Sequence, residues 1–287
     1  MRETTHPIDI QKPYIRYIQA FIFVAIYIAI GIVLRLLKLN PNIYLFMGIP
    51  LTLIFQIFIR KQPIQTLWVR EYSKFKLSKW GMLIAAAFII LPVKIITQMI
   101  LHNKIDIIII LYMVVVIMGT IGLAYSISHF NKSTMRFLLF CIATAGILGI
   151  GLFVATTIAH SINLHKAIQP DFKVGIKSLL IYIPACFIIE EVVFRGLLDS
   201  HVYHPGQKKG IWSAVFISAL WGLWHIPVAP VHGIWNLLIT TAVLITVHTI
   251  IGVPLSIFWR KSGNLVVTCF THSLIDAVRN FLSGTGI

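Results

Sequence analysis

The sequence predicts an all-α membrane protein, a polytopic bundle of about eight or nine transmembrane helices. Hydrophobic residues make up 58% of the 287 residues and charged residues only 11%, whereas a soluble domain usually carries about 25% charged residues. The hydrophobic residues fall in runs close to the roughly 20 residues that a spanning helix needs. These runs lack the period-2 alternation of barrel strands, so helices are the expected way to satisfy the backbone in lipid.

The first run, Tyr17–Leu37, follows a short basic segment and is longer than the apolar stretch of a signal peptide, which predicts a retained span. Pro227, Pro230 and Gly233 allow a re-entrant turn, and Pro254 allows a break in the eighth run, so eight spans fit as well as nine. The runs after the first are Ile43–Ile59, Gly81–Ile100, Ile107–Ile127, Phe137–Ala159, Leu179–Leu198, Ile211–Val228, Ile234–Phe258 and Leu265–Leu282.

Basic residues predict the orientation of the chain. With the N-terminus inside and nine spans, the inner loops hold fifteen lysines and arginines, and the outer loops hold five, which are Lys38, Lys104, Lys166, Lys173 and Lys177. Cytoplasmic loops of membrane proteins carry such an excess. The longest polar stretch, Arg60–Trp80, is then a basic cytoplasmic loop, expected to lie on the membrane surface. This distribution of the net charge of +15 favours membrane lipid over nucleic acid as the partner.

Three of the nine acidic residues fall inside apolar runs, namely Glu190, Glu191 and Asp276. An ionisable residue at the centre of a span costs about 2.5–3.5 kcal/mol on insertion scales. Such residues are therefore candidates for function or for a buried ion pair.

The first cluster reads E-E-V-V-F-R and spans Glu190 to Arg195. On a helix, Glu191 and Arg195 are four residues apart and can pair on one face. Glu190 points about 100° away from Glu191, so the same arginine compensates it less well. A carboxylate in such a poorly solvated place is suited to take and return protons near neutral pH. A purely structural ion pair explains Glu191 and Arg195 but leaves the second acid without a reason.

The second and third clusters add histidines on later spans. His225 follows Trp221 by four residues, and an isolated histidine in a span is often only a hydrogen-bonded packing residue. His272 and Asp276 are also four residues apart, so both project from one helix face. A His–carboxylate pair can orient an imidazole or act around an oxyanion.

Together the clusters read E-E-x-x-x-R, aromatic-x-x-x-H and H-x-x-x-D, each on a different late span. In this the sequence resembles the CPBP family of intramembrane proteases, also called the CAAX protease and bacteriocin-processing or Abi family, which includes the Rce1-like prenyl-protein proteases. The resemblance covers roughly Lys177–Leu282. It divides the chain into an N-terminal transmembrane region, residues 1–170, without the family motifs, and a protease core, residues 171–287.

The resemblance implies a role for each motif residue. The catalytic glutamate is Glu190, its supporting partners are Glu191 and Arg195, the histidine that helps to activate water is His225, and the final pair that holds the oxyanion is His272 and Asp276. Two positions depart from the family pattern. Trp221 stands where phenylalanine is commoner, and Asp276 stands where many members have asparagine. An ionised Asp276 would not stabilise an oxyanion directly, so it either holds His272 as a cation or is itself protonated.

We expect no cofactor. The sequence has no H-E-x-x-H motif and no C-x-x-C spacing, and the resemblance favours a metal-free glutamate mechanism, although residues of these types can bind zinc. The three cysteines, Cys141, Cys186 and Cys269, are interpreted as packing residues. Arg279 is interpreted as snorkelling to the interface, and His248, which lies mid-span, as non-catalytic.

The predicted function is that of an intramembrane endopeptidase. Its substrate would be a membrane-associated peptide or a lipidated protein, and its location the plasma membrane of a bacterium, since the chain is rich in Ile and Lys. One alternative is a non-proteolytic membrane scaffold or bacteriocin-immunity protein with the same fold. Another is a proton-coupled transporter, which lacks support because the chain shows no two-half repeat. The sequence predicts no oligomeric state.

Overall fold

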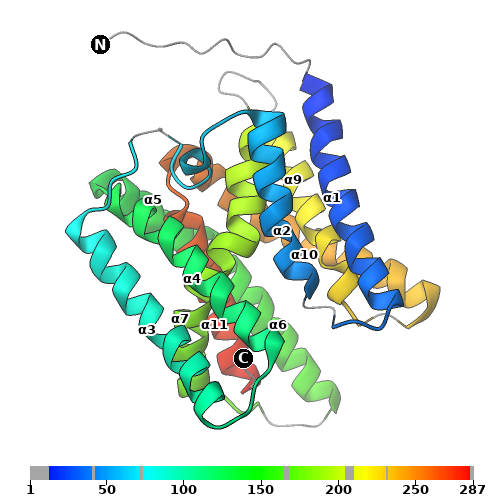
Figure 1. Ribbon diagram of the computed structural model, residues 1–287. Helices are drawn as coiled ribbons and strands as arrows, with labels where there is room; N and C mark the ends of the chain where they lie inside the picture. The colour runs from blue at the N-terminus through cyan, green and yellow to red at the C-terminus, as the bar shows by residue number, and fades with distance from the viewer. Residues whose placement is uncertain are drawn as a thin grey trace.

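The computed structural model describes residues 13–40, 43–70, 74–164, 168–203, 210–230 and 232–284. These residues form one helical bundle (Figure 1), and the strand geometry found in them is an isolated antiparallel bridge between Val69 and Asn264. The predicted all-α fold is confirmed. In chain order the helices are α1 (Pro13–Leu36), α2 (Ile43–Ile54), η1 (Phe55–Arg60), η2 (Ile64–Leu67), α3 (Lys79–Leu101), α4 (Ile107–Ser128), α5 (Lys132–Cys141), η3 (Ile142–Gly146), α6 (Ile147–Leu164), α7 (Phe172–Cys186), η4 (Phe187–Asp199), α8 (Ser200–Val202), α9 (Gly210–Trp224), η5 (Ile226–Val228), α10 (Gly233–Ser262) and α11 (Val266–Ser283).

Among the described residues, eight helical segments are long and apolar enough to cross a membrane, so the chain is a multi-pass membrane protein. Four of these segments are composite, because α2 continues into η1, α5 continues through η3 into α6, α7 continues through η4 into α8, and α9 continues into η5. The ninth predicted span forms α11 but is not among the eight. Its polar residues lower its hydropathy, and those at Thr268, Thr271, His272 and Asp276 are buried in the bundle.

The described residues support neither of the two alternatives that would reduce the number of spans. The break that Pro254 allows is absent, because α10 runs from Gly233 to Ser262 without interruption. Neighbouring elements in a membrane bundle can accommodate an interior proline in this way. Pro227 lies in the short η5 turn that joins α9 to α10, and both helices belong to candidate spans. This segment is therefore a connection between two spans.

Polar side chains define the starts of several helices. The side chain of Asp106 accepts a hydrogen bond from the Ile108 backbone N–H at 2.8 Å, and that of Asp171 accepts one from Lys173 at 2.8 Å. Each carboxylate satisfies backbone donors that the first turn of a helix leaves free. Two of the acidic residues outside the spans thus have structural roles as caps of α4 and α7.

Close backbone contacts hold the helices of the site together. A Cβ atom at Gly222 of α9 would lie 2.6 Å from the Leu244 carbonyl oxygen of α10. A Cβ atom at Gly119 of α4 would overlap the Pro184 carbonyl oxygen of α7. Small residues of this kind allow membrane helices to approach closely, and here they bring α9 against α10 and α4 against α7.

The described part of the loop that follows η1 packs on the bundle, and its expected place on the membrane surface stays a prediction. Leu67 is 1% exposed and Val69 is 7% exposed. The Trp68 carbonyl accepts a hydrogen bond from the Leu265 N–H at 3.0 Å, and the Arg70 N–H donates to the Gly263 carbonyl at 2.7 Å. Burial lowers the pKa of the Arg70 guanidinium. These contacts fix the start of α11, which carries the third motif.

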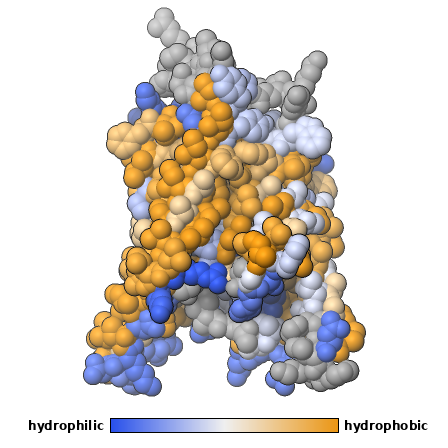
Figure 2. Space-filling view, turned by 90° about the vertical axis from the view of Figure 1, so that its right-hand side faces the viewer, coloured by the Kyte–Doolittle hydropathy of each residue, from blue (hydrophilic) through white to orange (hydrophobic). Residues whose placement is uncertain are grey.

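The exterior of the bundle suits a lipid environment. Figure 2 shows hydrophobic side chains over the flank of the molecule, with hydrophilic side chains gathered at its lower end. Large apolar residues remain exposed on several helices, among them Leu36, Leu101 and Trp235 at 76% each. An apolar surface of this extent is far larger than the patches that soluble monomers expose, and lipid is its natural neighbour.

The orientation gives a first testable prediction. A reporter inserted between Phe75 and Lys76 is expected to behave as cytoplasmic, because this loop belongs to the basic set of loops. A matched insertion next to Lys104, in the connection between α3 and α4, is expected to behave as external. Alkaline phosphatase and green fluorescent protein fusions measure the two sides independently. External activity at Phe75 together with internal activity at Lys104 would invert the orientation.

Candidate active site

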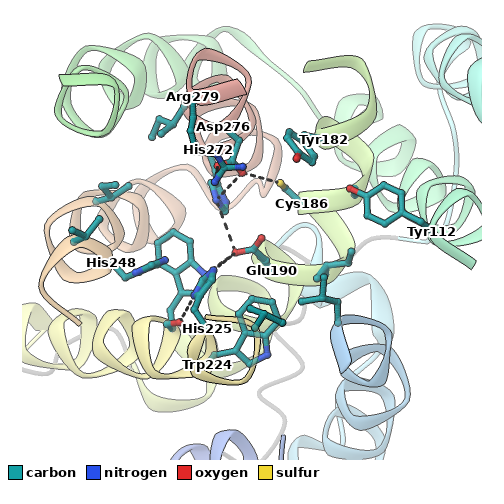
Figure 3. A pocket seen from close by; sticks show the side chains of 18 of the residues that line it. Tyr112, Tyr182, Cys186, Glu190, Trp224, His225, His248, His272, Asp276 and Arg279 are labelled. Carbon is teal, nitrogen blue, oxygen red and sulfur yellow. Dashed lines mark hydrogen bonds and ion pairs between the residues drawn. The ribbon is translucent and has the colours of Figure 1, made fainter. Parts of the chain in front are cut away.

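Residues from all three predicted motifs line one cavity of about 430 Å³. Glu190 comes from η4, His225 follows the last residue of α9, and His272 and Asp276 come from α11. Figure 3 shows these side chains pointing toward one another from separate helices. Glu191 and Arg195 lie behind them in the protein interior, at 0% and 1% exposure.

The E-E-x-x-x-R motif lies entirely within η4, a π-helical segment from Phe187 to Asp199. Such segments are rare and are found frequently at functional sites. The Glu190 side chain is 16% exposed, whereas that of Glu191 is fully buried. The two adjacent carboxylates therefore have different surroundings, with Glu190 at the cavity and Glu191 in the interior.

Glu190 Oε2 is the atom on which the site converges. It accepts a hydrogen bond from Trp221 Nε1 at 2.8 Å. His225 Nε2 and His272 Nε2 each lie 3.9 Å from it. A separation of this size is too long for a direct hydrogen bond, but a water molecule that bonds to both groups fits such a distance. Trp221, which departs from the family pattern by its indole, thus supplies a donor that phenylalanine lacks.

The orientation of His225 is set by the backbone. Its Nδ1 lies 2.9 Å from the Trp221 carbonyl oxygen, so Nδ1 carries the proton that is donated there. In the neutral ring, Nε2 then presents its lone pair toward Glu190. His248 of α10 packs against the same ring, with the ring centroids 4.1 Å apart, and its own Nδ1 lies 2.7 Å from the Leu244 carbonyl oxygen.

Glu191 contacts Arg195, as the spacing predicts, but its hydrogen bond goes to His272. The Glu191 and Arg195 side chains approach to 3.6 Å, whereas Glu191 Oε1 accepts from His272 Nδ1 at 3.0 Å. The Arg195 guanidinium also lies over the Trp221 ring, 4.2 Å from its centroid, which is a cation–π geometry. Glu191 therefore compensates a buried cation and also fixes the ring of a site histidine.

Asp276 sits between two cationic or potentially cationic groups. Its Oδ1 accepts from Arg279 Nη1 at 2.9 Å, and its Oδ2 lies 3.5 Å from His272 Nε2. Cys186 donates to the same Oδ2 at 3.7 Å. Arg279 is thus an ion-pair partner of Asp276, and snorkelling alone does not describe it. The carboxylate thus lies between the Arg279 guanidinium and the His272 ring, an arrangement that suits the alternative in which Asp276 holds His272 as a cation.

Comparison with known families gives one match. Residues 174–278 match the family model of the type II CAAX prenyl endopeptidases, Rce1-like. The chain contains an Rce1-like domain. The match confirms the predicted resemblance and supports an intramembrane endopeptidase as the general activity. Searches of curated proteins and of solved structures found no match to the chain.

The cavity also contains residues that the sequence analysis did not assign to the site. His248, Cys186 and Arg279 all line the cavity. For two of them a local signal exists, since Cys186 precedes Glu190 by four residues and Arg279 follows Asp276 by three, which places each pair on one helix face. His248 lies on α10, and no spacing in the sequence connects it to His225.

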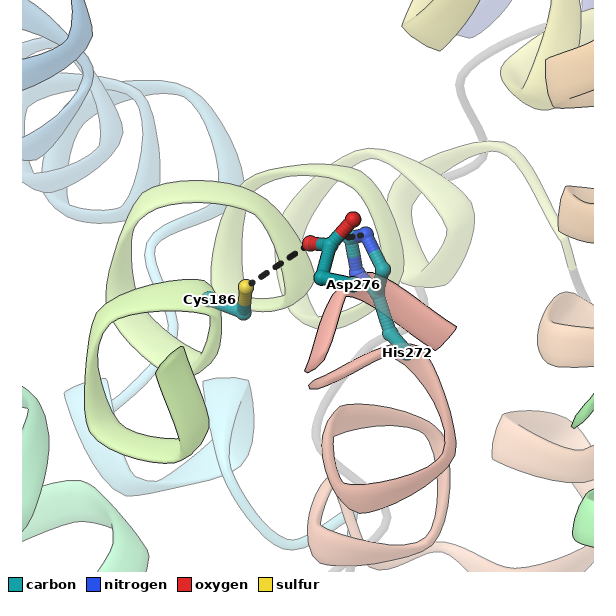
Figure 4. A group of neighbouring side chains, drawn as sticks. All are labelled: Cys186, His272 and Asp276. Carbon is teal, nitrogen blue, oxygen red and sulfur yellow. Dashed lines mark hydrogen bonds and ion pairs between the residues drawn. The ribbon is translucent and has the colours of Figure 1, made fainter. Parts of the chain in front are cut away.

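Three of the cavity side chains bring atoms that a metal ion can bind close to one another. Within the described residues, Cys186, His272 and Asp276 are the group whose ligand atoms all lie within 4.8 Å of one another (Figure 4). The thiol comes from α7, and the other two residues come from α11. Cys186 is buried, as expected of a packing residue, and it also contacts Asp276.

Proposed function

We propose that the Rce1-like domain hydrolyses a peptide bond with a water molecule that Glu190 and His225 activate, without a catalytic metal. The observation that carries this proposal is the convergence on Glu190 Oε2 of the Trp221 indole N–H and the His225 imidazole, both from α9 and its end, and of the His272 imidazole from α11. The carboxylate is only partly exposed, inside a cavity with a predominantly apolar lining. Fixed dipoles and charges act most strongly in such a water-poor site.

In the first step the water is held between Glu190 Oε2 and His225 Nε2. Both atoms have lone pairs available, because Nδ1 of His225 carries the proton donated to the Trp221 carbonyl. The water loses a proton to Glu190 and its oxygen attacks the peptide carbonyl. A positioned base of this kind typically contributes about 10²–10⁴-fold to a rate.

In the second step His272 steadies the negative charge on the carbonyl oxygen. Glu191 holds Nδ1 at 3.0 Å, and Asp276 faces Nε2 at 3.5 Å, so two carboxylates favour the doubly protonated ring. The Nε2–H then points into the cavity as a charged donor. Glu190 returns its proton to the leaving amine as the carbon–nitrogen bond breaks, which regenerates the starting state.

The location of the cavity suggests the side from which substrate enters. Among its lining residues, Leu45 lies in the first turn of α2 and Ile108 in the first turn of α4. α2 begins where α1 has crossed the bundle, so these residues lie at the end opposite the start of α1 (Figure 1). With the start of α1 inside, this end is external. We propose an exported or membrane-bound peptide as substrate, in the plasma membrane of a bacterium.

Cleavage by the purified protein in lipid vesicles tests this proposal. Membrane-associated peptides, with and without a lipid anchor, are incubated in water enriched in heavy oxygen. Hydrolysis by an activated water is expected to place one heavy oxygen in the new carboxyl terminus of the product in a single turnover. If the label instead enters the Glu190 carboxylate, the glutamate acts as a nucleophile and the proposed base mechanism is wrong.

Metal removal gives a further prediction. Activity is expected to survive prolonged treatment with a strong chelator, because every group that the mechanism uses belongs to the chain. The measurement is the cleavage rate before and after dialysis against chelator, with elemental analysis of the same samples. A stoichiometric metal that leaves together with the activity, and restores it when added back, would contradict the mechanism.

A further inference from the structure

We propose that Cys186, His272 and Asp276 form a binding site for zinc or a similar thiophilic divalent metal, and that the bound metal inhibits the enzyme. The binding half of this proposal is independent of the proposed function. The inhibitory half rests on it, because it requires that His272 take part in the reaction.

The ligand atoms already lie close to the spacing that a tetrahedral metal needs. Cys186 Sγ lies 3.7 Å from Asp276 Oδ2, and His272 Nε2 lies 3.5 Å from the same oxygen. Ligands bound to zinc at 2.0–2.3 Å are about 3.3–3.8 Å apart in a tetrahedral site. All three ligand atoms lie within 4.8 Å of one another, so small side-chain adjustments suffice to close the site.

The outer partners of two ligands are those expected around a metal. His272 binds Glu191 Oε1 through Nδ1 at 3.0 Å, which leaves Nε2 as the ligand atom. Metal-binding histidines almost always donate their other N–H to a carboxylate or carbonyl in this way. Arg279 holds Oδ1 of Asp276 at 2.9 Å and leaves Oδ2 directed at the site. These contacts restrict both ligands to useful orientations.

The chemistry of the set selects the class of metal. A thiol, an imidazole and a carboxylate suit zinc, cobalt(II) and cadmium, whereas magnesium and calcium prefer oxygen ligands alone. All three residues line the cavity, so a metal can reach them by the path that serves the substrate. Three protein ligands leave a fourth position for a water molecule. As the metal–sulfur bond forms, the Cys186 thiol releases its proton to solvent.

Inhibition follows from which atom of His272 the metal occupies. Its Nε2 faces Glu190 Oε2 at 3.9 Å and is the donor to the carbonyl oxygen in the proposed mechanism. Coordination removes the Nε2–H and places a divalent charge beside the catalytic carboxylate. A bound metal therefore removes the oxyanion donor and prevents the second step of the proposed mechanism.

Cobalt(II) tests the binding half directly. The full-length protein is purified in detergent without a polyhistidine tag, treated with chelator and titrated with cobalt(II). We expect a sulfur-to-cobalt charge-transfer absorption at one metal per chain, displaced by zinc. Cys186→Ala is expected to abolish this band. It should also weaken cobalt affinity by more than about 10-fold, because loss of a residue that only orients a ligand already costs about 10-fold. The matched control is Cys141→Ala, a buried thiol on α5 outside the set of cavity residues, which should keep the band.

The cleavage rate with and without added zinc tests the inhibitory half. For wild type and Cys141→Ala, zinc at the concentration that saturates the cobalt-competition assay is expected to lower the rate at least 10-fold. For Cys186→Ala, the same zinc concentration should leave the rate within twofold of that variant's own zinc-free rate.

A charge-transfer band that persists in Cys186→Ala, or that never forms in folded wild type, overturns the binding site. Binding without loss of activity, or activity that requires zinc, overturns the inhibitory role. A protein that binds cobalt as expected but cleaves nothing contradicts the proposed function and leaves the metal site standing.

Discussion

Glu191→Gln is expected to lower the free energy of unfolding by about 3–5 kcal/mol, the cost of removing one partner of a buried ion pair. Both side chains of the pair are essentially inaccessible, at 0% for Glu191 and 1% for Arg195. The Arg195 nitrogens have no hydrogen-bond partner within the described part of the chain. The variant would leave this cation with only the face of Trp221 to compensate it. Thermal unfolding in detergent measures the effect.

A double variant separates charge compensation from packing. Glu191→Gln combined with Arg195→Met removes both charges and keeps similar side-chain volumes. Replacement of a whole buried pair is often neutral, whereas loss of one partner is costly. The double variant should therefore recover most of the stability that Glu191→Gln loses. If its loss equals or exceeds the sum of the two single losses, the pair does not act by charge compensation.

Glu190→Gln is expected to reduce the cleavage rate by about 10²–10⁴-fold, the usual effect of losing a general base, while stability stays close to that of wild type. The amide keeps the shape of the side chain, and its oxygen can still accept from Trp221 Nε1, which lies 2.8 Å from Oε2. It cannot take a proton from water. Within the described residues Glu190 forms no ion pair with an arginine, and the His272 ring keeps Glu191 and Asp276 as its carboxylate neighbours.

Comparison of the two variants distinguishes the roles of the adjacent glutamates. Glu191→Gln retains an amide oxygen that can accept from His272 Nδ1, so per folded molecule it should cleave clearly faster than Glu190→Gln. Glu190→Gln should in turn unfold at a higher temperature than Glu191→Gln. A reversal of both orders would assign the base to Glu191 and the structural role to Glu190.

Local spacing within one helix was the part of the site that the sequence could predict. Residues four apart share a face, and the structure places Glu191 near Arg195 and His272 near Asp276 accordingly. The same rule applies to Arg279, three residues after Asp276, but snorkelling explained that arginine equally well. Contacts between distant helices have no such rule. The bond between Glu191 and His272 joins residues 81 positions apart, and it depends on how α7, η4 and α11 pack.

For the fold, the sequence could predict the presence of the helices but not their local geometry. The apolar runs gave the helices, because lipid leaves few other ways to satisfy the backbone. They gave no sign of the π-helical segment from Phe187 to Asp199, since hydropathy carries no information on which backbone hydrogen bonds a helix forms. Hydropathy also describes α11 poorly, because its polar residues face the bundle interior and its environment is largely protein. The division of the chain into an N-terminal transmembrane region, residues 1–170, and a protease core, residues 171–287, stays a prediction.

The most direct test of the account is the rate of peptide cleavage by purified wild type and Glu190→Gln, each reconstituted in the same vesicles after removal of metal. Asp106→Asn is the matched control, because it changes an acid at the start of α4 to an amide that still caps the helix. The account predicts that wild type and the control cleave at similar rates and that Glu190→Gln, folded to the same extent, is slower by at least about 100-fold. Cleavage by Glu190→Gln at the wild-type rate would contradict the central role of Glu190.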